Sequence, residues 1–389
     1  YLPINDSEYP YAGIPRIVIE TRDLRKVKDR ETKIPAKMQI YGTDAPTSEV
    51  MDLTIKGRGN TSWTLTHKRG YKIELNEKES LFGMPKNRDW ALIASYADKT
   101  LMKNYLSYQI ASRIGMPYSP KCTFVEFYLN REYQGVYLLT ETIKIGKNRV
   151  NIPETKDSYL VEIDTKYKED EQVIFTKTTR PFRIHSPKNA SKETLDILKR
   201  HLNHIEAHID TNYDVGYDTL SQWFDLEAYA MHHWVQEYTK NPDAAFYTSI
   251  FFTWVDGGPI KMGPVWDFDL SFGGALDEEG RKTSGWKTKT HYWSRFLFRN
   301  EQFEEYTNKF WDENKDAFVG IPDTIETLRK LLENPARNNF KRWNILKSTE
   351  NHQHIYAYDT YDEAVDSLKN WAIKRYEWIN KYVQKKLKK

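Results

Sequence analysis

The first half of the chain is patterned as short apolar runs separated by turn-forming residues. Runs of this length, rich in Val, Ile, Leu and Tyr, are typical of β-strands. They cover Arg16–Glu20, Ala36–Tyr41, Met51–Lys56, Gly70–Leu75 and Trp90–Tyr96. Cys122–Leu129 and Tyr133–Thr140, joined by Asn130-Arg131-Glu132, predict a β-hairpin. The first half is therefore predicted to be mainly β.

Helical periodicity, in which apolar residues recur every three or four positions, takes over in the second half. One earlier helix is predicted after Asp98, which caps it, and Gly115-Met116-Pro117 ends it. Later helices are predicted from Ser191 onward and over Asp225–Glu237, Gln302–Ala317, Asp323–Leu332 and Tyr361–Val383. The length suits two domains. We expect an α+β protein with a β-rich part over residues 1–145, including an N-terminal strand extension, and a mainly helical part over residues 146–389.

A further hairpin is predicted in the middle of the chain. Ala245–Trp254 is rich in Phe, Tyr, Thr and Ile, and a second apolar run, Pro259–Val265, follows it. Between them lies Asp256-Gly257-Gly258. Asp-Gly between two apolar runs favours a tight turn, because the central residues of such a turn need positive φ.

Two acidic segments flank this hairpin, Asn241-Pro242-Asp243 and Trp266-Asp267-Phe268-Asp269. A turn centred on Asp256 and Gly257 places Asp267 opposite Phe246, about three residues from Asp243. Carboxylates that meet at the open end of a hairpin, one of them able to hold a metal, have the layout of a kinase catalytic loop and its magnesium-binding aspartate. The alternative is a solvated acidic loop on an ordinary hairpin, and the geometry alone leaves both open.

Composition narrows the classes of function. Basic and acidic residues nearly balance, 58 against 55, for a net charge of +3, which gives little support to nucleic-acid binding. No stretch approaches the roughly 20 apolar residues of a transmembrane helix. Cys122 is the single cysteine, so no intrachain disulfide forms, and we expect a buried, unreactive thiol. The start at Tyr1-Leu2-Pro3 is typical of a processed chain that has lost a targeting segment.

Several motifs follow one another in a defined order. They are Arg58-Gly59-Asn60-Thr61-Ser62, Tyr71-Lys72-Ile73-Glu74-Leu75, Gln134-Gly135-Val136-Tyr137-Leu138-Leu139-Thr140-Glu141, Asn241-Pro242-Asp243 and Gly263-Pro264-Val265-Trp266-Asp267-Phe268-Asp269. In this order they resemble the signatures of the spore coat protein H (CotH) kinase family, over roughly residues 50 to 275. The resemblance implies a two-lobed, atypical protein-kinase-like fold, with a β-rich N-terminal lobe and a mainly helical C-terminal lobe.

The resemblance also implies a function. Members similar to this chain transfer phosphate from ATP to secreted or surface proteins. We therefore expect a metal-dependent bacterial phosphotransferase that is secreted, periplasmic or on the cell surface, and monomeric, with a nucleotide and a protein substrate as partners. The alternative is a surface adhesin or a catalytically inactive binding module on the same fold. A glycoside hydrolase that uses Asp243 with Asp267 or Asp269 is a third interpretation, which leaves Lys72 without a role.

Phosphoryl transfer needs carboxylates on a metal and one acceptor for the substrate proton. Asp267, directly after a predicted strand, is the first candidate metal ligand, and Asp269 joins it if the chain stays extended. Ligands of oxygen alone favour Mg²⁺ or Mn²⁺ over zinc. Asp243 is the candidate general base or second metal ligand, and Asn241 supports it by hydrogen bonding or by coordinating the metal.

Binding of the ATP phosphates requires cations and backbone N–H groups. Lys72 alternates with the apolar residues of its strand and is the leading candidate for an ion-pairing lysine, with Lys68 and Arg69 as close competitors. A glycine-containing loop suited to close approach of a phosphate, although not a Walker A loop, is formed by Arg58, Gly59, Asn60 and Ser62. Glu141 lies at the expected hinge, where backbone groups meet an adenine.

Some features depart from the family pattern or stay open. Positions 246–248, near which many members carry a further metal-binding Asn, hold Phe, Tyr and Thr, so that this ligand is missing or replaced by Ser249. The helix from Met102 to Ile114 has no Glu to pair with Lys72, and Gln109 is the nearest polar candidate. Glu162 and Asp164 share one face of a strand, which either belongs to the site or is merely polar. The histidines of one helical stripe have the spacing of a metal site but are more typical of a half-exposed helix flank; they are His201, His204 and His208.

Overall fold

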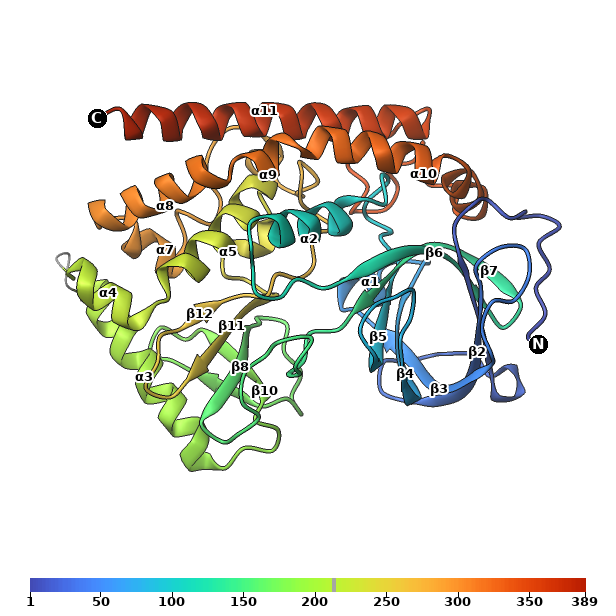
Figure 1. Cartoon of the computed structure of the whole chain (residues 1–389), viewed down its shortest axis with the longest axis horizontal. Coiled ribbons are helices and arrows are strands. Elements are labelled where there is room, and N and C mark those ends of the chain that lie inside the picture. The colour runs from blue at the N-terminus through green and yellow to red at the C-terminus, as the bar shows by residue number, and fades with distance from the viewer. Residues whose placement is uncertain (212–214) are drawn as a thin grey trace. The chain divides into compact units, whose positions relative to one another are not determined.

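The computed structural model describes residues 1–211 and 215–389, and the chain divides into two compact units (Figure 1). Unit 1 comprises Tyr1–Tyr105, Lys121–Thr142 and Asp323–Lys369. Unit 2 comprises Leu106–Pro120, Ile143–Pro322 and Asn370–Lys389. Each unit is assembled from several stretches of the chain and has a hydrophobic core of its own.

A closed β-barrel forms the centre of unit 1 (Figure 1). Its strands are β1 (Arg16–Thr21), β2 (Ile34–Tyr41), β3 (Met51–Arg58), β4 (Gly70–Glu79), β5 (Asn87–Ile93), β6 (Cys122–Leu129) and β7 (Glu132–Glu141). Around the barrel the order is β1, β2, β3, β4, β5, β7, β6. Neighbouring strands are antiparallel, except that β1 closes the barrel by pairing with β6 in parallel. Closure removes the open strand edges that would otherwise pair with other chains.

Alternation along the strands fills the barrel with apolar side chains. In β4, Tyr71, Ile73 and Leu75 are buried in the core cluster, whereas Lys72 and Glu74 between them are partly exposed. This is the period of two expected of a strand, in which successive side chains point to opposite faces. Because the apolar set faces the barrel interior, Lys72 belongs to the outer wall.

Short helices and parts of longer ones complete unit 1. They are η1 (Arg22–Leu24), α1 (Thr61–Thr64), most of α10 (Ile321–Arg342) and the first residues of α11 (Tyr361–Leu387). On α10, Asn339 accepts a hydrogen bond from the backbone N–H of Val136 in β7, and the amide nitrogen of Asn338 donates to buried Glu126 in β6. These bonds attach α10 to the barrel.

An antiparallel sheet forms the framework of unit 2. Its strands are β8 (Ser158–Ile163), β9 (Val173–Phe175), β10 (Pro181–Ser186), β11 (Ile250–Val255) and β12 (Lys261–Met262), in the order β12, β11, β8, β10, β9. The hairpin expected in the middle of the chain is present as β11 and β12, with Gly258 N–H donating to the carbonyl of Val255 across the turn. It is shorter than expected, and its register is displaced by one residue, since Phe252 opposes Met262.

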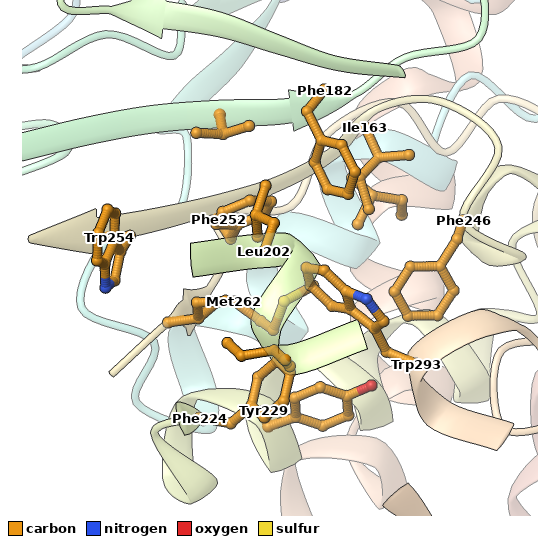
Figure 2. Close-up of a cluster of buried hydrophobic side chains, with 14 of the residues drawn as sticks. Ile163, Phe182, Leu202, Phe224, Tyr229, Phe246, Phe252, Trp254, Met262 and Trp293 are labelled. Atoms are coloured by element: carbon orange, nitrogen blue, oxygen red, sulfur yellow. The ribbon is translucent and has the colours of Figure 1, made fainter. Parts of the chain in front are cut away.

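A large apolar cluster packs against this sheet (Figure 2). Ile163, Phe182 and Phe252 contribute from β8, β10 and β11, and helix α3 (Lys192–Thr211) contributes leucines and isoleucines. Trp293 packs among them, with its ring centre 6.0 Å from that of Phe182 and 5.6 Å from that of Phe252. Burial of each large apolar side chain is worth roughly 1.5–3 kcal/mol, so the cluster holds β8 and β11 firmly. The acidic residues described below lie near the ends of these strands.

The other helices lie almost entirely in unit 2. They are α2 (Lys103–Arg113), α4 (Tyr217–Trp223), α5 (Leu226–Thr239), η2 (Pro242–Ala244), α6 (Glu278–Arg281), α7 (Tyr292–Leu297), α8 (Glu301–Asn314) and α9 (Asp316–Val319). Within the described ranges, no helix combines the length and the apolar character that crossing a membrane requires.

The expectation of an α+β protein is confirmed, because strands dominate the first part of the chain and helices the later part. The fold adds two features that were not expected. The strands of the first part close into a barrel, and the helices of the later part are accompanied by a sheet. Both features depend on pairing between strands that are distant in sequence, such as β1 with β6 and β8 with β11.

Candidate functional site

Helix α5 leads directly to the first acidic segment. Asp225 caps its start by accepting a hydrogen bond from Ala228 N–H, and every residue from Ala228 to Thr239 is buried. The helix ends where Lys240 adopts the left-handed conformation, with φ 47° and ψ 49°. This conformation turns the chain sharply at many helix C-termini, and Asn241 follows here. A capped, buried helix therefore sets the position of the Asn-Pro-Asp segment.

Asn241 connects the two acidic segments. It is buried, and its Oδ1 accepts from the N–H of Asp243 at 3.2 Å. Its Nδ2 donates to Gln236 Oε1 at 3.0 Å and to the carbonyl oxygen of Asp267 at 3.1 Å. One amide thus bridges the segments on the two sides of the hairpin. The sequence left two roles open for Asn241. The contacts show that it supports Asp243 by hydrogen bonding, and its coordination of a metal stays a prediction.

Asp267 has an unusual backbone conformation. Its φ is 65°, in the left-handed region, which costs a non-glycine residue on the order of 1–3 kcal/mol. Its side chain is exposed, whereas Phe268 is fully buried and packs edge-on against Tyr108, with 6.1 Å between the ring centres. Burial of Phe268 and the bond from Asn241 hold this strained residue in place. Asp269, the next acid along the chain, is partly buried.

Negative charge accumulates around Asp243. Protein atoms surround its carboxyl group on most sides, although solvent reaches part of the side chain. Burial is the largest cause that raises its pKa, the carboxylates of Asp267, Asp269 and Asp164 act in the same direction, and Lys166 opposes them. Together they raise the pKa from 3.8 to about 7. A carboxyl group with a pKa near neutrality is suited to proton transfer. The structure thus places Asp267 and Asp269 within electrostatic reach of Asp243.

Asp164, which the sequence left undecided, joins this group. It follows β8, is almost fully buried, and accepts hydrogen bonds from Thr248 Oγ1 and from the N–H of Lys166, both at 2.9 Å. Arg183 lies 3.6 Å from its Oδ2. The signal in the sequence was the alternation of Glu162 and Asp164 with apolar residues. The pairing of β8 with β11 that carries Asp164 to the site had no local signal.

The glycine-containing loop belongs to unit 1 and is tightly held. Gly59 has a φ of 106°, and a Cβ atom at this position would collide with Ser62 Oγ, so the turn requires glycine. Arg30 donates from Nη1 to the carbonyl of Gly59 at 2.7 Å and to Asn60 Oδ1 at 2.8 Å. Arg58 ends β3 just before this turn. The loop has the tight form expected for close approach of a phosphate, and the binding itself stays a prediction.

Lys72 lies on the outer wall of the barrel in unit 1. Its Nζ is 3.6 Å from Asp89 Oδ1 in β5, and Lys56 stands opposite it in β3. Burial lowers the pKa of Lys72, Asp89 acts in the opposite direction, and solvent weakens the shift because 39% of the side chain is exposed. Its partner is thus a carboxylate of a neighbouring strand rather than a residue of α2. Its contact with ATP stays a prediction.

Lys68 and Glu141, also in unit 1, have structural partners. Lys68 is 1% exposed and donates from Nζ to the carbonyl oxygens of Ala94, at 2.6 Å, and of Val136. A lysine enclosed in this way supports the barrel, so it no longer competes with Lys72. Glu141 is fully buried, and its Oε1 accepts from the N–H of Lys121 at 2.9 Å. The backbone N–H of Glu141 donates to the carbonyl of Lys121, also at 2.9 Å.

The histidine stripe on α3 packs against tryptophans. His201 stacks on Trp254 with 4.1 Å between ring centres, and burial lowers its pKa to about 4. His204 and His208 approach Trp223 at 5.8 Å and 5.7 Å. Among the residues with described positions, no three or more His, Cys, Asp or Glu side chains are grouped as a ready metal site. The stripe is a packed helix flank.

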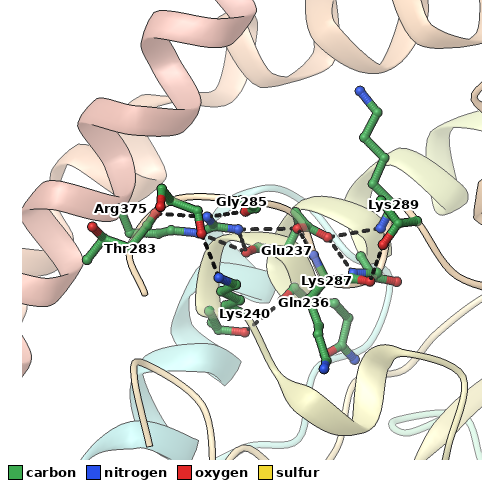
Figure 3. A network of polar contacts seen from close by, with 12 residues as sticks. Gln236, Glu237, Lys240, Thr283, Gly285, Lys287, Lys289 and Arg375 are labelled. Atoms are coloured by element: carbon green, nitrogen blue, oxygen red, sulfur yellow. Dashed lines mark hydrogen bonds and ion pairs between the residues drawn. The ribbon is translucent and has the colours of Figure 1, made fainter. Parts of the chain in front are cut away.

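A second charged group lies one helical turn before the acidic segments (Figure 3). Glu237 of α5 and Arg375 of α11 are fully buried and form an ion pair at 3.2 Å. Glu237 also accepts from the N–H groups of residues 287, 288 and 289, at 2.6, 2.7 and 3.1 Å. Lys240 donates through Nζ to the carbonyl oxygens of residues 279, 282 and 284. These contacts fasten the segment 277–289 to α5.

Comparison with known proteins agrees with the motifs. Residues 55–379 match the family described as CotH kinase protein, and this range contains both acidic segments, Asp164 and Lys72. No curated protein matches the sequence. Because the family match covers most of the chain, this protein belongs to the CotH kinase family.

Proposed function

We propose that this chain is a metal-dependent phosphotransferase that moves the γ-phosphate of ATP to a hydroxyl group of a secreted or surface protein. The observation that carries the proposal is the gathering of Asp164, Asp243, Asp267 and Asp269 in unit 2, with the pKa of Asp243 at about 7. Membership of the CotH kinase family supports kinase chemistry in general. The metal, the acceptor protein and a secreted, periplasmic or cell-surface location are parts of this proposal.

The donor set suits a hard divalent cation. Carboxylates that act on one another electrostatically, as these do on Asp243, repel one another, and a bound cation relieves that repulsion. Mg²⁺ is usually held by one or two carboxylates together with waters and substrate phosphates, so it needs no ready group of three acidic side chains. Asp267 and Asp269 would hold Mg²⁺ or Mn²⁺, with Asn241 as support or further ligand. When bound, the metal supplies neutralisation of the phosphate charge.

Asp243 is the proposed general base. A base is most effective when its pKa lies near the working pH, and a pKa of about 7 meets this condition. It would accept the proton of the acceptor hydroxyl, while the hydrogen bond from its N–H to Asn241 keeps the segment in place.

Unit 1 is proposed to supply the nucleotide contacts. The loop of Arg58, Gly59, Asn60 and Ser62 would approach the phosphates, and backbone groups at Glu141 other than its N–H, which donates to Lys121, would meet the adenine. Lys72 is the proposed ion-pairing lysine, with Asp89 as the partner that orients it. Lys72 stands on the outer wall of a closed barrel. A variant that removes this lysine would test whether it binds ATP.

Transfer of label from γ-labelled ATP tests the proposal. With Mn²⁺, we expect the wild-type chain to label itself or proteins of a mixed pool, and Asp243→Asn and Asp267→Ala to lose at least ~100-fold in rate. Glu305→Gln is the matched control, since it removes an exposed carboxylate of the same unit that pairs with Lys309 on the surface. No transfer by the wild-type chain with any nucleotide and either metal would overturn the proposed enzyme.

One observation favours a second function, a surface adhesin or binding module on the same fold. Near the position where many family members carry a further metal-binding Asn, Phe246 is buried in the core and the hydroxyl of Thr248 binds Asp164. Phe246 offers no metal ligand, and the hydroxyl of Thr248 is already engaged with Asp164. A chain that binds ATP with metal in a thermal-shift assay but transfers no phosphate would support this alternative.

A further inference from the structure

The segment that follows β8 is joined to the segment that follows Asp243. The N–H of Thr165 donates to the carbonyl of Tyr247 at 3.0 Å. The N–H of Tyr247 donates in turn to the carbonyl of Asp243, also at 3.0 Å. Lys166 comes directly after Thr165. Backbone hydrogen bonds therefore join the segment that carries Lys166 to the segment that begins at Asp243.

The side chain of Lys166 extends over the ring of Tyr247. Its Nζ lies 5.5 Å from the ring centre, within the range of a cation–π contact. The backbone N–H of Lys166 donates to Asp164 Oδ1 at 2.9 Å, so both ends of the residue are oriented. Tyr247 is 45% exposed. The ammonium group thus lies against an exposed ring, and Lys166 itself is partly exposed.

The charge of Lys166 acts on Asp243. Asp267, Asp269 and Asp164 raise the pKa of Asp243, and Lys166 lowers it, which places the ammonium within electrostatic reach of this carboxyl. A site made of carboxylates repels the phosphates of a nucleotide, so a cation in this position reduces the repulsion.

Two nearby arginines, Arg183 in β10 and Arg180 just before it, hold parts of the framework. Arg183 lies 3.6 Å from Asp164 and 2.9 Å from Glu171. Arg180 donates to the carbonyl of Phe246 at 3.2 Å. These contacts hold the framework of the site. Lys166 differs from these arginines in position, because it is the cation whose charge acts on Asp243.

We propose that Lys166 is a further catalytic residue, whose ammonium binds oxygens of the phosphoryl group that is transferred at Asp243. This rests on the phosphotransferase function proposed above. In the transfer, the acceptor hydroxyl oxygen bonds to the γ-phosphorus and its proton passes to Asp243. The bond from that phosphorus to the β,γ-bridging oxygen breaks, and its electron pair remains on ADP. Lys166 keeps its proton and stabilises charge on the non-bridging oxygens.

Variants of the full chain test this role. Lys166→Met keeps the length of the side chain and removes its charge, Lys166→Arg restores a cation, and Lys168→Met is the control on the same segment. We measure ATP turnover with Mn²⁺, ATP and ADP affinity by titration calorimetry, and the melting temperature. For Lys166→Met we expect a kcat lowered about 100-fold, ATP affinity weakened more than ADP affinity, and a slightly lower melting temperature, because Lys166 offsets part of the repulsion between the carboxylates. Lys166→Arg should recover part of the rate, and Lys168→Met should resemble the wild type.

The remaining outcomes count against the role of Lys166, against the phosphotransferase proposal, or against both. A wild-type kcat in Lys166→Met would overturn the role of Lys166 and leave the phosphotransferase proposal intact. Equal losses of ATP and ADP affinity would also overturn it, because a contact with the transferred phosphoryl group must weaken ATP binding more than ADP binding. If the wild type binds ATP without turnover, the enzyme proposal fails. The contact between Lys166 and the γ-phosphate is then supported if Lys166→Met loses the preference for ATP over ADP, and it is overturned if the preference is retained. No ATP binding by the wild type would overturn both.

Discussion

Two groups of charged residues lie within about one turn of each other along α5 and its continuation, and they are organised in opposite ways. In the first, Glu237 is matched by Arg375 and by backbone N–H groups, and Lys240 by backbone carbonyl oxygens. In the second, Asp243 is surrounded by further carboxylates, with Lys166 opposing them. The first group pairs opposite charges inside the fold, whereas in the second the four carboxylates outnumber the cations Lys166 and Arg183.

The difference indicates what each group does. Charges whose partners are supplied by the fold stabilise a segment, here 277–289, and need no ligand. Like charges held together cost stability unless a cation binds among them. Backbone strain accumulates in the same region, since Phe246, Ser249 and Asp267 all have positive φ. We therefore assign structural support to the first group and function to the second.

Breaking the balanced group should have the largest effect on stability. Arg375→Met leaves the buried Glu237 carboxylate without its cation, and it removes the donor to the carbonyls of Thr283 and Gly285. We expect a loss of about 3–5 kcal/mol in the free energy of unfolding, measured by denaturant titration. The double variant Glu237→Gln/Arg375→Met should recover part of the loss, because no unpaired charge remains. A double variant no more stable than the single one would contradict this explanation.

Adding a cation to the acidic group should give the next largest effect. Mg²⁺ or Mn²⁺ with ATP, at 100 times the dissociation constant, adds roughly 2.7 kcal/mol of stability, visible as a higher melting temperature. The shift should disappear in Asp267→Ala, which loses the main proposed ligand, and persist in Glu305→Gln. A shift of unchanged size in Asp267→Ala would mean that the metal and nucleotide bind without this residue.

Removing one of the like charges should stabilise the chain at high pH. The pKa of Asp243 is about 7 in the folded chain against an ordinary 3.8, so the folded chain binds more protons between these values and loses stability as the pH rises through them. In EDTA, Asp243→Asn should be more stable than the wild type by roughly 2 kcal/mol at pH 8, a figure reduced for partial exposure, and nearly equal to it at pH 4.

Denaturant titrations of both proteins at the two pH values measure this difference. Burial lowers the pKa values of His201 and His232 to about 4. Both histidines are present in the wild type and in the variant, so their contributions cancel in the difference in stability. A difference in stability that is the same at pH 4 and pH 8 would show that Asp243 does not titrate in this interval.

An exposed ion pair on the segment 277–289 should have the smallest effect. Lys282 pairs with Glu279 at the surface, where solvent screens the interaction. We expect Lys282→Ala to leave the midpoint of denaturant unfolding unchanged, because the segment is held by Lys240 and Glu237 from inside. A clearly lower midpoint would show that surface charges also hold this segment.

Local patterns predicted most elements of the fold. The barrel strands, the hairpin of β6 and β7, and α5 lie within a few residues of their expected positions, because alternation and helical spacing report which face is buried. Helix α10 is an exception. It continues through Pro335 to Arg342, beyond the predicted end at Leu332, and Asn338 and Asn339 in this continuation bind the barrel. Tertiary contacts thus extend a helix beyond its local signal.

Pairing over long distances in sequence accounts for the differences at the site. Residues 245–249 were expected in a strand, but β11 begins at Ile250, after Phe246 and Ser249 with positive φ. The main partner of β11 is β8, which brings Asp164 to Asp243. The alternation around Lys72 predicted its face correctly but not that the sheet closes, which makes this face an outer wall.

The peptide bond between Asn241 and Pro242 protects the side chain of Asn241 from deamidation. Asparagine ages to aspartate when the backbone nitrogen of the next residue attacks its side-chain amide. Pro242 has no N–H to lose, so this route of deamidation is closed. An aspartate at position 241 would accept from Asp243 N–H but could not donate to the carbonyl of Asp267, and it would add negative charge. The proline therefore preserves the bridge between the acidic segments over the life of the protein.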